Sequence, residues 1–336
     1  MIHSPSGVVT RCMHSAIGFS VILAASLFLP AKGAALDFPV KGRPITMIVP
    51  FAAGGPTDVG ARILVPFMEK ELGTNIQIVN KPGASTQIGV TELVRAKPDG
   101  YTIAMVAPPT AIMTYIDKER GAPYGRKDIA PIAGYTRDSN LVVVPGNSPF
   151  KTVEELIDAA KARPKQIKVG TSGLMTSAHL AGVALEEAAG VRFAFVHFNG
   201  AAPQTTAMLG GNLDAAINGI LATLPHHKAG AMRVLGTLDD TETKFFPGVK
   251  TVKEQGFDVY SPVTFGLVAP GGTPNEIIDL IGATVRKAMN EPELTKKLDE
   301  VALSPGYRDP NDFVAFWDGS EITTTRLVGL AKQRQD

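Results

Sequence analysis

The chain has 336 residues and a formal net charge of +1, with 44% hydrophobic and 19% charged residues. This composition is typical of a soluble globular protein, and the length is sufficient for two domains of ordinary size. No long basic or acidic run is present in the sequence. The composition therefore argues against a nucleic-acid-binding protein.

The first 35 residues differ in composition from the rest of the chain. Arg11 is the only formal charge before Lys32, and an apolar stretch runs from residue 16 to residue 29. This length suits the core of a secretory signal and is too short for a membrane span. Small residues at 33–35 offer a cleavage site. We therefore expect residues 1–35 to be a signal peptide and the mature protein to be periplasmic; a retained membrane anchor is the alternative.

The only cysteine, Cys12, lies inside this segment. The mature chain would therefore have no disulfide, no thiolate nucleophile and no cysteine-based metal site. The residues directly before Cys12, Val9-Thr10-Arg11, do not form a lipobox.

Short apolar strands alternate with amphipathic helices along the mature chain, which predicts an α/β fold. In the first part, either Ser85 or Thr86 could cap the helix that follows the second strand. We expect strands at 45–49, 76–79, 101–106, 141–144, 167–169, 193–198, 213–217, 233–237 and 264–269. We expect helices from 56 to 72, after 86, and at 153–162, 177–189, 201–209, 274–290, 292–301 and 310–332.

The pattern of strands and helices restarts near residue 141, so one α/β unit is nested inside another. We expect domain 1 to comprise residues 36–138 and 260–336, and domain 2 to comprise residues 139–259. The chain would cross between the domains near 135–141 and 257–263. Two mixed, mostly parallel sheets joined by a two-strand hinge would then form a cleft that can close over a ligand.

Four loops are expected at the carboxyl ends of strands, where ligands bind in parallel sheets. They are residues 51–58, 80–87, 170–177 and 198–203, and they are rich in Gly, Ser, Thr or Asn. Each leads into a helix N-terminus, whose free N–H groups favour an anion. For any single loop, ordinary turn chemistry is the alternative explanation.

The histidines give no support for a metal centre. His179, His197, His226 and His227 lack the spacing of metal ligands, and the adjacent pair 226–227 would point in different directions. We expect no metal and no cofactor. For His179, a packed or cap-supporting role and a ligand contact both remain open.

A series of short motifs, taken together, resembles the substrate-binding proteins of tripartite tricarboxylate transporters, also called the Bug family. The resemblance covers essentially all of the mature chain, in order. The motifs are Val49–Asp58 with Ala61-Arg62, Asn80–Ala84, Lys97–Thr102, Ser177–Gly182, Gly200–Pro203, Leu209–Gly211 and Gly266–Pro270.

This resemblance implies a two-lobed periplasmic binding protein of the Venus-flytrap type, acting as a monomer without a cofactor. It would deliver a small carboxylate to membrane permease subunits and would not be an enzyme. By position, the residues implied to contact the ligand are Phe51, Ala52, Gly54, Gly55, Thr57, Asp58, Ser85, Thr86, Gln87, Pro108, Ser172, Thr176, Ser177, His179, Asn199, Ala201 and Asn218.

The sequence departs from the family pattern at several positions. Ser85-Thr86-Gln87 stands where the family often continues with glycine, and residues 107–110 form a rigid, proline-rich stretch. Leu174 and Met175 bring apolar side chains into the third loop. An apolar lining would suit an aromatic dicarboxylate such as terephthalate. A second carboxylate would meet Arg137, unless Arg137 is an ordinary surface arginine.

Two other functions compete with transport. A periplasmic hydrolase or isomerase could use Asp58 or His179 as its base. A ligand-sensing partner of a signalling receptor would have the same cleft, so the sequence does not separate it from a transport protein.

Overall fold

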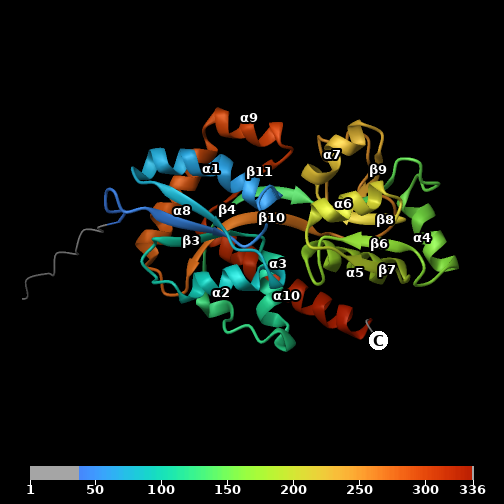
Figure 1. Cartoon of the computed structure of the whole chain (residues 1–336), viewed down its shortest axis with the longest axis horizontal. Helices are drawn as coiled ribbons and strands as arrows, with labels where there is room; N and C mark the ends of the chain where they lie inside the picture. Colours follow the sequence, from blue (N-terminus) through green and yellow to red (C-terminus); the bar gives the residue numbers. More distant parts are fainter. Residues whose placement is uncertain (1–37, 335–336) are drawn as a thin grey trace, which may run out of the picture. The chain divides into compact units, whose positions relative to one another are not determined.

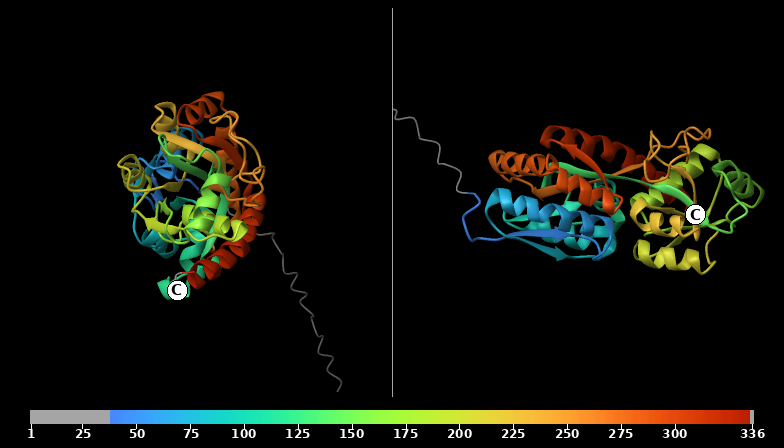
Figure 2. Two further views of the ribbon diagram at one scale, coloured as in Figure 1. Left: turned by 90° about the vertical axis from the view of Figure 1, so that its right-hand side faces the viewer. Right: turned by 90° about the horizontal axis from the view of Figure 1, so that it is seen from above.

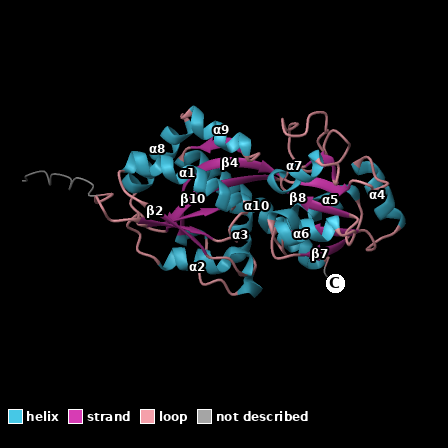
Figure 3. Cartoon of the chain, turned by 45° about the horizontal axis from the view of Figure 1, so that its top comes forward, coloured by secondary structure: helices cyan, strands magenta, loops and turns pink. Residues whose placement is uncertain are grey.

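The computed structural model describes residues 38–334, and the predicted signal peptide at 1–35 lies outside this range. The described chain contains two mixed β-sheets with helices packed on them (Figure 1). Figure 3 shows the strands in magenta, with helices beside each set. In the described part of the chain, no helix is long and apolar enough to cross a membrane.

The first sheet has six strands in the order β11-β4-β10-β3-β1-β2. Strand β1 pairs in parallel with β2 and β3, and the other pairings are antiparallel. Its strands are β1 (Ile45–Val49), β2 (Ile76–Asn80), β3 (Thr102–Val106), β4 (Ile129–Ser139), β10 (Pro262–Pro270) and β11 (Ser304–Arg308). The helices in these segments are α1 (Pro56–Leu72), α2 (Gln87–Arg95), α3 (Pro108–Ile116), α8 (Asn275–Met289), α9 (Pro292–Glu300) and α10 (Pro310–Gln333), with the short 3-10 helices η1 (Ala84–Thr86), η2 (Lys118–Arg120) and η3 (Arg126–Asp128).

The second sheet has five strands in the order β7-β6-β8-β5-β9. Strand β6 pairs in parallel with β7 and β8, whereas β5 pairs antiparallel with β8 and β9. Its elements are β5 (Leu141–Pro145), α4 (Val153–Ala162), β6 (Lys168–Thr171), α5 (Ser177–Ala189), β7 (Ala194–His197), α6 (Ala201–Leu209), β8 (Ala215–Asn218), α7 (Ile220–Lys228) and β9 (Met232–Thr237).

Each sheet is covered by apolar cores on both of its faces. In β1, Met47 contributes to one core and Ile48 to another, as the alternation of side chains along a strand requires. The same alternation places Val142 and Val143 of β5 in different cores. Burial on both faces explains why these strands are continuous apolar runs rather than alternating ones.

The chain leaves the first sheet after Ser139 and returns to it at Pro262. The right-hand view of Figure 2 shows the green and yellow elements, which include the second sheet, grouped apart from the blue ones. Helix α10 packs against both groups, since it contacts β4 of the first sheet and α5 beside the second. The division into domains at 138/139 and 259/260 stays a prediction.

The strand pairing is less parallel than the sequence suggested. Strands β4 and β10 carry the chain out of the first sheet and back into it, so they run in opposite directions and pair antiparallel. Strand β4 was missed because Pro131 and Gly134 interrupt its apolar pattern. The sequence analysis also missed β11, α3 and α7; helix α3 begins with the proline pair that was read as a rigid stretch.

Candidate functional site

The four candidate loops lie at the carboxyl ends of parallel strands. In the first sheet, Val49 at the end of β1 is paired with Asn80 at the end of β2. In the second sheet, Thr171 at the end of β6 is paired with His197 at the end of β7. The register therefore places loops 51–58 and 80–87 beside each other, and loops 170–177 and 198–203 beside each other.

The first loop is held in shape by the carboxylate of Asp58. This carboxylate accepts hydrogen bonds from the Gly54 N–H (2.8 Å), from Arg62 Nε (3.0 Å) and from Asn80 Nδ2 (3.0 Å). Asn80 Nδ2 also donates to the Phe51 carbonyl (3.1 Å). Burial raises the pKa of Asp58, but the hydrogen bonds from Arg62, Gly54 and Asn80 outweigh burial, so the pKa is lowered. Asp58 is thus an ionised structural anchor whose oxygens are already engaged.

The second loop has a left-handed backbone conformation that residues other than glycine rarely adopt. Ala84, Ser85 and Thr86 all have positive φ, at 46°, 51° and 82°. Each such residue costs about 1–2 kcal/mol relative to a right-handed conformation. Strain of this kind concentrates at binding sites and persists where the surroundings enforce it.

Neither Ser85 nor Thr86 caps helix α2, so that expectation is wrong. A residue at the N-cap normally has an extended backbone, and the left-handed backbone of Thr86 does not direct its hydroxyl to the helix N–H groups. The Thr86 hydroxyl is buried without a hydrogen-bond partner. A buried unsatisfied hydroxyl is costly, which favours a role in contacting a ligand.

The third loop is fixed by a neutral histidine. His179 is buried, and its Nδ1 accepts a hydrogen bond from the N–H of Met175 (3.0 Å), whose φ of 59° is also left-handed. Burial, aided by the neighbouring His197, lowers the pKa of His179 to about 3. Its ring packs edge-on against Phe195. These contacts favour the packed, loop-supporting role of His179 over a ligand contact.

Hydrogen bonds connect all four loops in sequence. Asn80 joins the first loop to the second, as described above, and Ser85 Oγ donates to the carbonyl of Leu174 in the third (3.2 Å). The Gly200 N–H in the fourth loop donates to the Ser172 carbonyl (3.0 Å). The loops from both sheets therefore form one continuous surface.

The charges within these loops are few and already paired. The loops contain two charged side chains, Asp58 and Lys81, and Lys81 forms an ion pair with Glu92 (3.2 Å). The helices that follow the loops, α1, α2, α5 and α6, have no side-chain hydrogen bond at the N-cap. The N–H groups of their first turns are thus the principal donors that a carboxylate would meet.

The predicted contact residues differ in how far solvent reaches them. Asn218 is buried, with its amide engaged by the Thr205 hydroxyl and the Gly219 N–H, and Pro108 is buried at the start of α3. The exposed or partly exposed residues are Phe51, Ala52, Gly54, Gly55, Ser85, Gln87, Ser172, Ser177, Asn199 and Ala201; the buried ones are Thr57, Asp58, Thr86, Pro108, Thr176, His179 and Asn218.

Arg137 is a partly exposed arginine in ion pairs, which favours the surface alternative over a contact with a second carboxylate. Its guanidinium donates to the carboxylates of Asp239 and Asp240, the latter at 2.8 Å. It therefore ties β4 to the segment after β9. Because its charge is already paired, it is not a free cation waiting for a second carboxylate.

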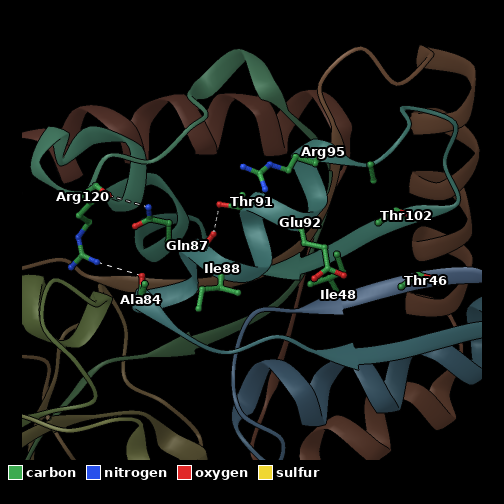
Figure 4. A pocket seen from close by; sticks show the side chains of 11 residues that line it. Thr46, Ile48, Ala84, Gln87, Ile88, Thr91, Glu92, Arg95, Thr102 and Arg120 are labelled. Atoms are coloured by element: carbon green, nitrogen blue, oxygen red, sulfur yellow. Dashed lines mark hydrogen bonds between the residues drawn. The ribbon is translucent and has the colours of Figure 1, made fainter.

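A pocket of about 870 Å³ lies beside helix α2 and reaches the second loop (Figure 4). Arg120, which the sequence analysis did not single out, stands at the end of this pocket near Ala84. No sequence signal marked Arg120, because it lies 36 positions away from the residue that it contacts. In the described residues, no group of three or more His, Cys, Asp or Glu side chains could hold a metal ion.

Comparison with known sequences identifies the family. The profile of the tripartite tricarboxylate transporter family receptor (TctC) matches residues 61–328. The "UPF0065 protein in gbd 5'region" of Cupriavidus necator is 34% identical, over 90% of this chain and 92% of its own length. The protein BugT of Bordetella pertussis is 30% identical, over 82% of this chain and 85% of its own length.

Solved structures of similar proteins share the fold. An R. palustris protein solved with adipate has a TM-score of 0.79 and 26% identity, covering 88% of this chain and 99% of the other. MatC from Rhodopseudomonas palustris with bound malate has a TM-score of 0.75 and 25% identity, covering 87% of this chain and 99% of the other.

Proposed function

The chain belongs to the tripartite tricarboxylate transporter receptor family, and from this premise we propose that it captures a small dicarboxylate or tricarboxylate in the periplasm and delivers it to permease subunits. Members of this family are solute-binding proteins and not enzymes, and this chain is likewise a solute-binding protein. We further propose that residues 1–35 are removed as a signal peptide, that the mature protein is a monomer, and that residues 139–259 form a lobe that moves about a two-strand hinge.

One observation carries the proposal: the connected loop surface combines uncapped helix N-termini with no unpaired charged side chain. N–H groups and hydroxyls bind a carboxylate at a helix N-terminus without an opposite charge. The anchored carboxylate of Asp58 is turned to its own loop and to Arg62, so it leaves the donors of that loop for the ligand. We propose that Thr86, through its unpartnered hydroxyl, binds one carboxylate of the ligand.

The apolar part of the loop surface bears on the ligand class. Leu174 is 40% exposed and lies in the third loop, and Ile88, at the start of α2, is 53% exposed. Two structural relatives were solved with aliphatic dicarboxylates, adipate and malate. We propose a dicarboxylate with an apolar middle, aliphatic or aromatic, with terephthalate as the aromatic example.

A thermal-shift screen of the purified protein tests the proposal. The panel contains adipate, malate, citrate, terephthalate and glutamate, together with the diamides of adipate and terephthalate as uncharged controls. A ligand at 100 times its Kd raises the free energy of unfolding by about 2.7 kcal/mol, which a melting curve detects readily. We expect a shift with at least one diacid and none with its diamide. If no acid raised the melting temperature, the carboxylate proposal would be wrong.

The same samples separate binding from catalysis. Chromatography of the bound acid after prolonged incubation should return it unchanged. Turnover that disappears in Asp58→Asn would instead support the hydrolase or isomerase alternative. Deletion of the gene should abolish uptake of the acid by cells if the protein serves transport, whereas a sensing role would leave uptake intact.

A further inference from the structure

The left-handed conformation of residues 84–86 requires support from outside the segment. Three consecutive residues with side chains occupy a region that glycine occupies freely. The Ser85 hydroxyl donates a hydrogen bond to the Leu174 carbonyl, while the buried Thr86 hydroxyl has no hydrogen-bond partner. From its own side of the molecule, helix α3 packs against this segment, and Arg120 forms hydrogen bonds with Ala84 and Gln87.

Arg120 engages the loop at both of its ends. Its Nη1 donates to the carbonyl of Ala84 at 3.4 Å, and its own carbonyl accepts a hydrogen bond from Gln87 Nε2 at 3.1 Å. Figure 4 shows both interactions, with the Arg120 side chain reaching down to Ala84 and its backbone facing Gln87. The two contacts bracket the three left-handed residues.

Arg120 is itself anchored by Asp117, which is held in turn by Lys332. Its Nε donates to Asp117 Oδ2 (3.3 Å), and Asp117 also accepts from Lys332 of helix α10 (2.5 Å). Lys332 pairs with Glu119 as well (2.9 Å). The side chains of Arg120 and Asp117 are 17% and 8% exposed. The guanidinium is therefore directed to the loop backbone by a fixed carboxylate.

We propose that Arg120 is a positioning residue that holds Ala84–Thr86 in the left-handed conformation competent to bind the ligand carboxylate. The inference rests on the proposed function, because it assigns the loop the task of binding that carboxylate. Arg120 acts through the backbone of the loop and makes no contact with the ligand. Glycine would adopt this conformation freely, whereas the side chains at 84–86 make the conformation depend on support from Arg120.

A general electrostatic attraction between a guanidinium and an anionic ligand is the competing explanation. Arg95 provides a matched control, since it lines the same pocket and is exposed. Among the described residues, the exposed Arg95 side chain has no hydrogen-bond or ion-pair partner. Arg95→Gln removes the same charge as Arg120→Gln without removing a contact to the loop.

The experiment measures the Kd of the best acid from the panel by calorimetry, and the melting temperature without ligand. Loss of a hydrogen bond from a charged donor predicts about a 10- to 100-fold weaker Kd for Arg120→Gln. We expect less than about a threefold change for Arg95→Gln, consistent with a solvated surface charge. Equal losses in the two variants, or no loss in Arg120→Gln, would overturn the inference.

Glycine at position 84 supplies a rescue test. Ala84→Gly removes the cost of the left-handed backbone at the residue whose carbonyl Arg120 binds. We expect Arg120→Gln to weaken binding less in the Ala84→Gly background than in the native background, a coupling that a double-mutant cycle quantifies. An equal loss in both backgrounds would favour direct electrostatics and reject positioning. If the unmodified protein bound no acid at all, the proposed function would fail first, and this inference with it.

Discussion

Asp138 lies where the chain passes from one sheet to the other, and it provides a test of how burial changes the pKa of a carboxyl group. It is the penultimate residue of β4, and its side chain is fully buried. Its Oδ1 accepts hydrogen bonds from the N–H groups of Ser139 (2.8 Å) and Ile220 (3.2 Å), the latter at the N-terminus of α7. The pKa of Asp138 is raised from 3.8 to about 6: burial is the main cause, the two backbone hydrogen bonds oppose it, and the charge of Asp239 adds to the rise.

The sign of the pH effect follows from this shift. A carboxyl with a higher pKa in the folded state binds its proton more tightly there than in the unfolded chain. It therefore stabilises the folded state below pH 3.8, and this contribution disappears as the pH rises through about 6. A shift of about two pKa units corresponds to about 3 kcal/mol. Asp138→Asn is isosteric and cannot titrate, so it lacks this contribution at every pH.

Urea unfolding of both proteins between pH 4.5 and 7.5 measures the effect. We expect the stability of Asp138→Asn relative to the unmodified protein to rise by about 2 kcal/mol across this range. Asp58 and Asp117, whose pKa values are lowered, destabilise both proteins alike at acid pH and cancel in the difference. The exposed Asp158, replaced by Asn, is the control and should give a flat difference. A flat difference for Asp138→Asn would refute the argument that its ionised form is disfavoured by burial.

Three further substitutions test other contacts. Asp58→Asn should lower the free energy of unfolding by about 2–3 kcal/mol, because it breaks a charged hydrogen-bond network, and it should also weaken ligand binding. An unchanged midpoint of urea unfolding would contradict this. Gly266→Ala should cost at least about 3 kcal/mol in thermal unfolding, since its Cβ would lie 2.3 Å from Phe313 Cζ; a native melting temperature would refute this packing. His179→Phe should cost about 1–3 kcal/mol at pH 8 by orphaning the Met175 N–H. The cost should be about 2 kcal/mol smaller at pH 5, because the unfolded imidazole takes up a proton below its pKa of 6.5 while the folded His179, with a pKa of about 3, stays neutral; an equal loss at both pH values would contradict the lowered pKa.

Much of the fold could be predicted because its information is local. Strand β1 is a run of β-branched and apolar residues that ends at a proline, and helix α1 begins at Pro56 and ends at Gly73, both frequent at those positions. The sequence did not reveal β4, because Pro131 and Gly134 break the apolar pattern. These residues are tolerated there by the long antiparallel pairing with β10, which is a tertiary interaction.

The location of the candidate site was also predictable, but the roles of its side chains were not. Loops at the carboxyl ends of parallel strands follow from the order of strands and helices. Gly54 and Arg62 engage Asp58 from four positions away, but its bond to Asn80 spans 22 positions, and the support for Ala84 comes from Arg120, 36 positions away. Local patterns contain no information about such partners. The same limit applied to Arg137, whose partner Asp239 lies 102 positions away.

A neutral loop surface suits a protein that must release what it binds. A ligand carboxylate buried against an arginine would form a desolvated ion pair, and separating such a pair leaves a buried charge that costs several kcal/mol. Here the arginines are already in ion pairs within the protein: Arg62 with Asp58, Arg137 with Asp239 and Asp240, and Arg120 with Asp117. On the proposed function, these paired charges would leave only neutral donors to exchange with water when an anion binds and is released. On this proposal, the charged residues shape the loops, and the neutral donors of the loops hold the ligand.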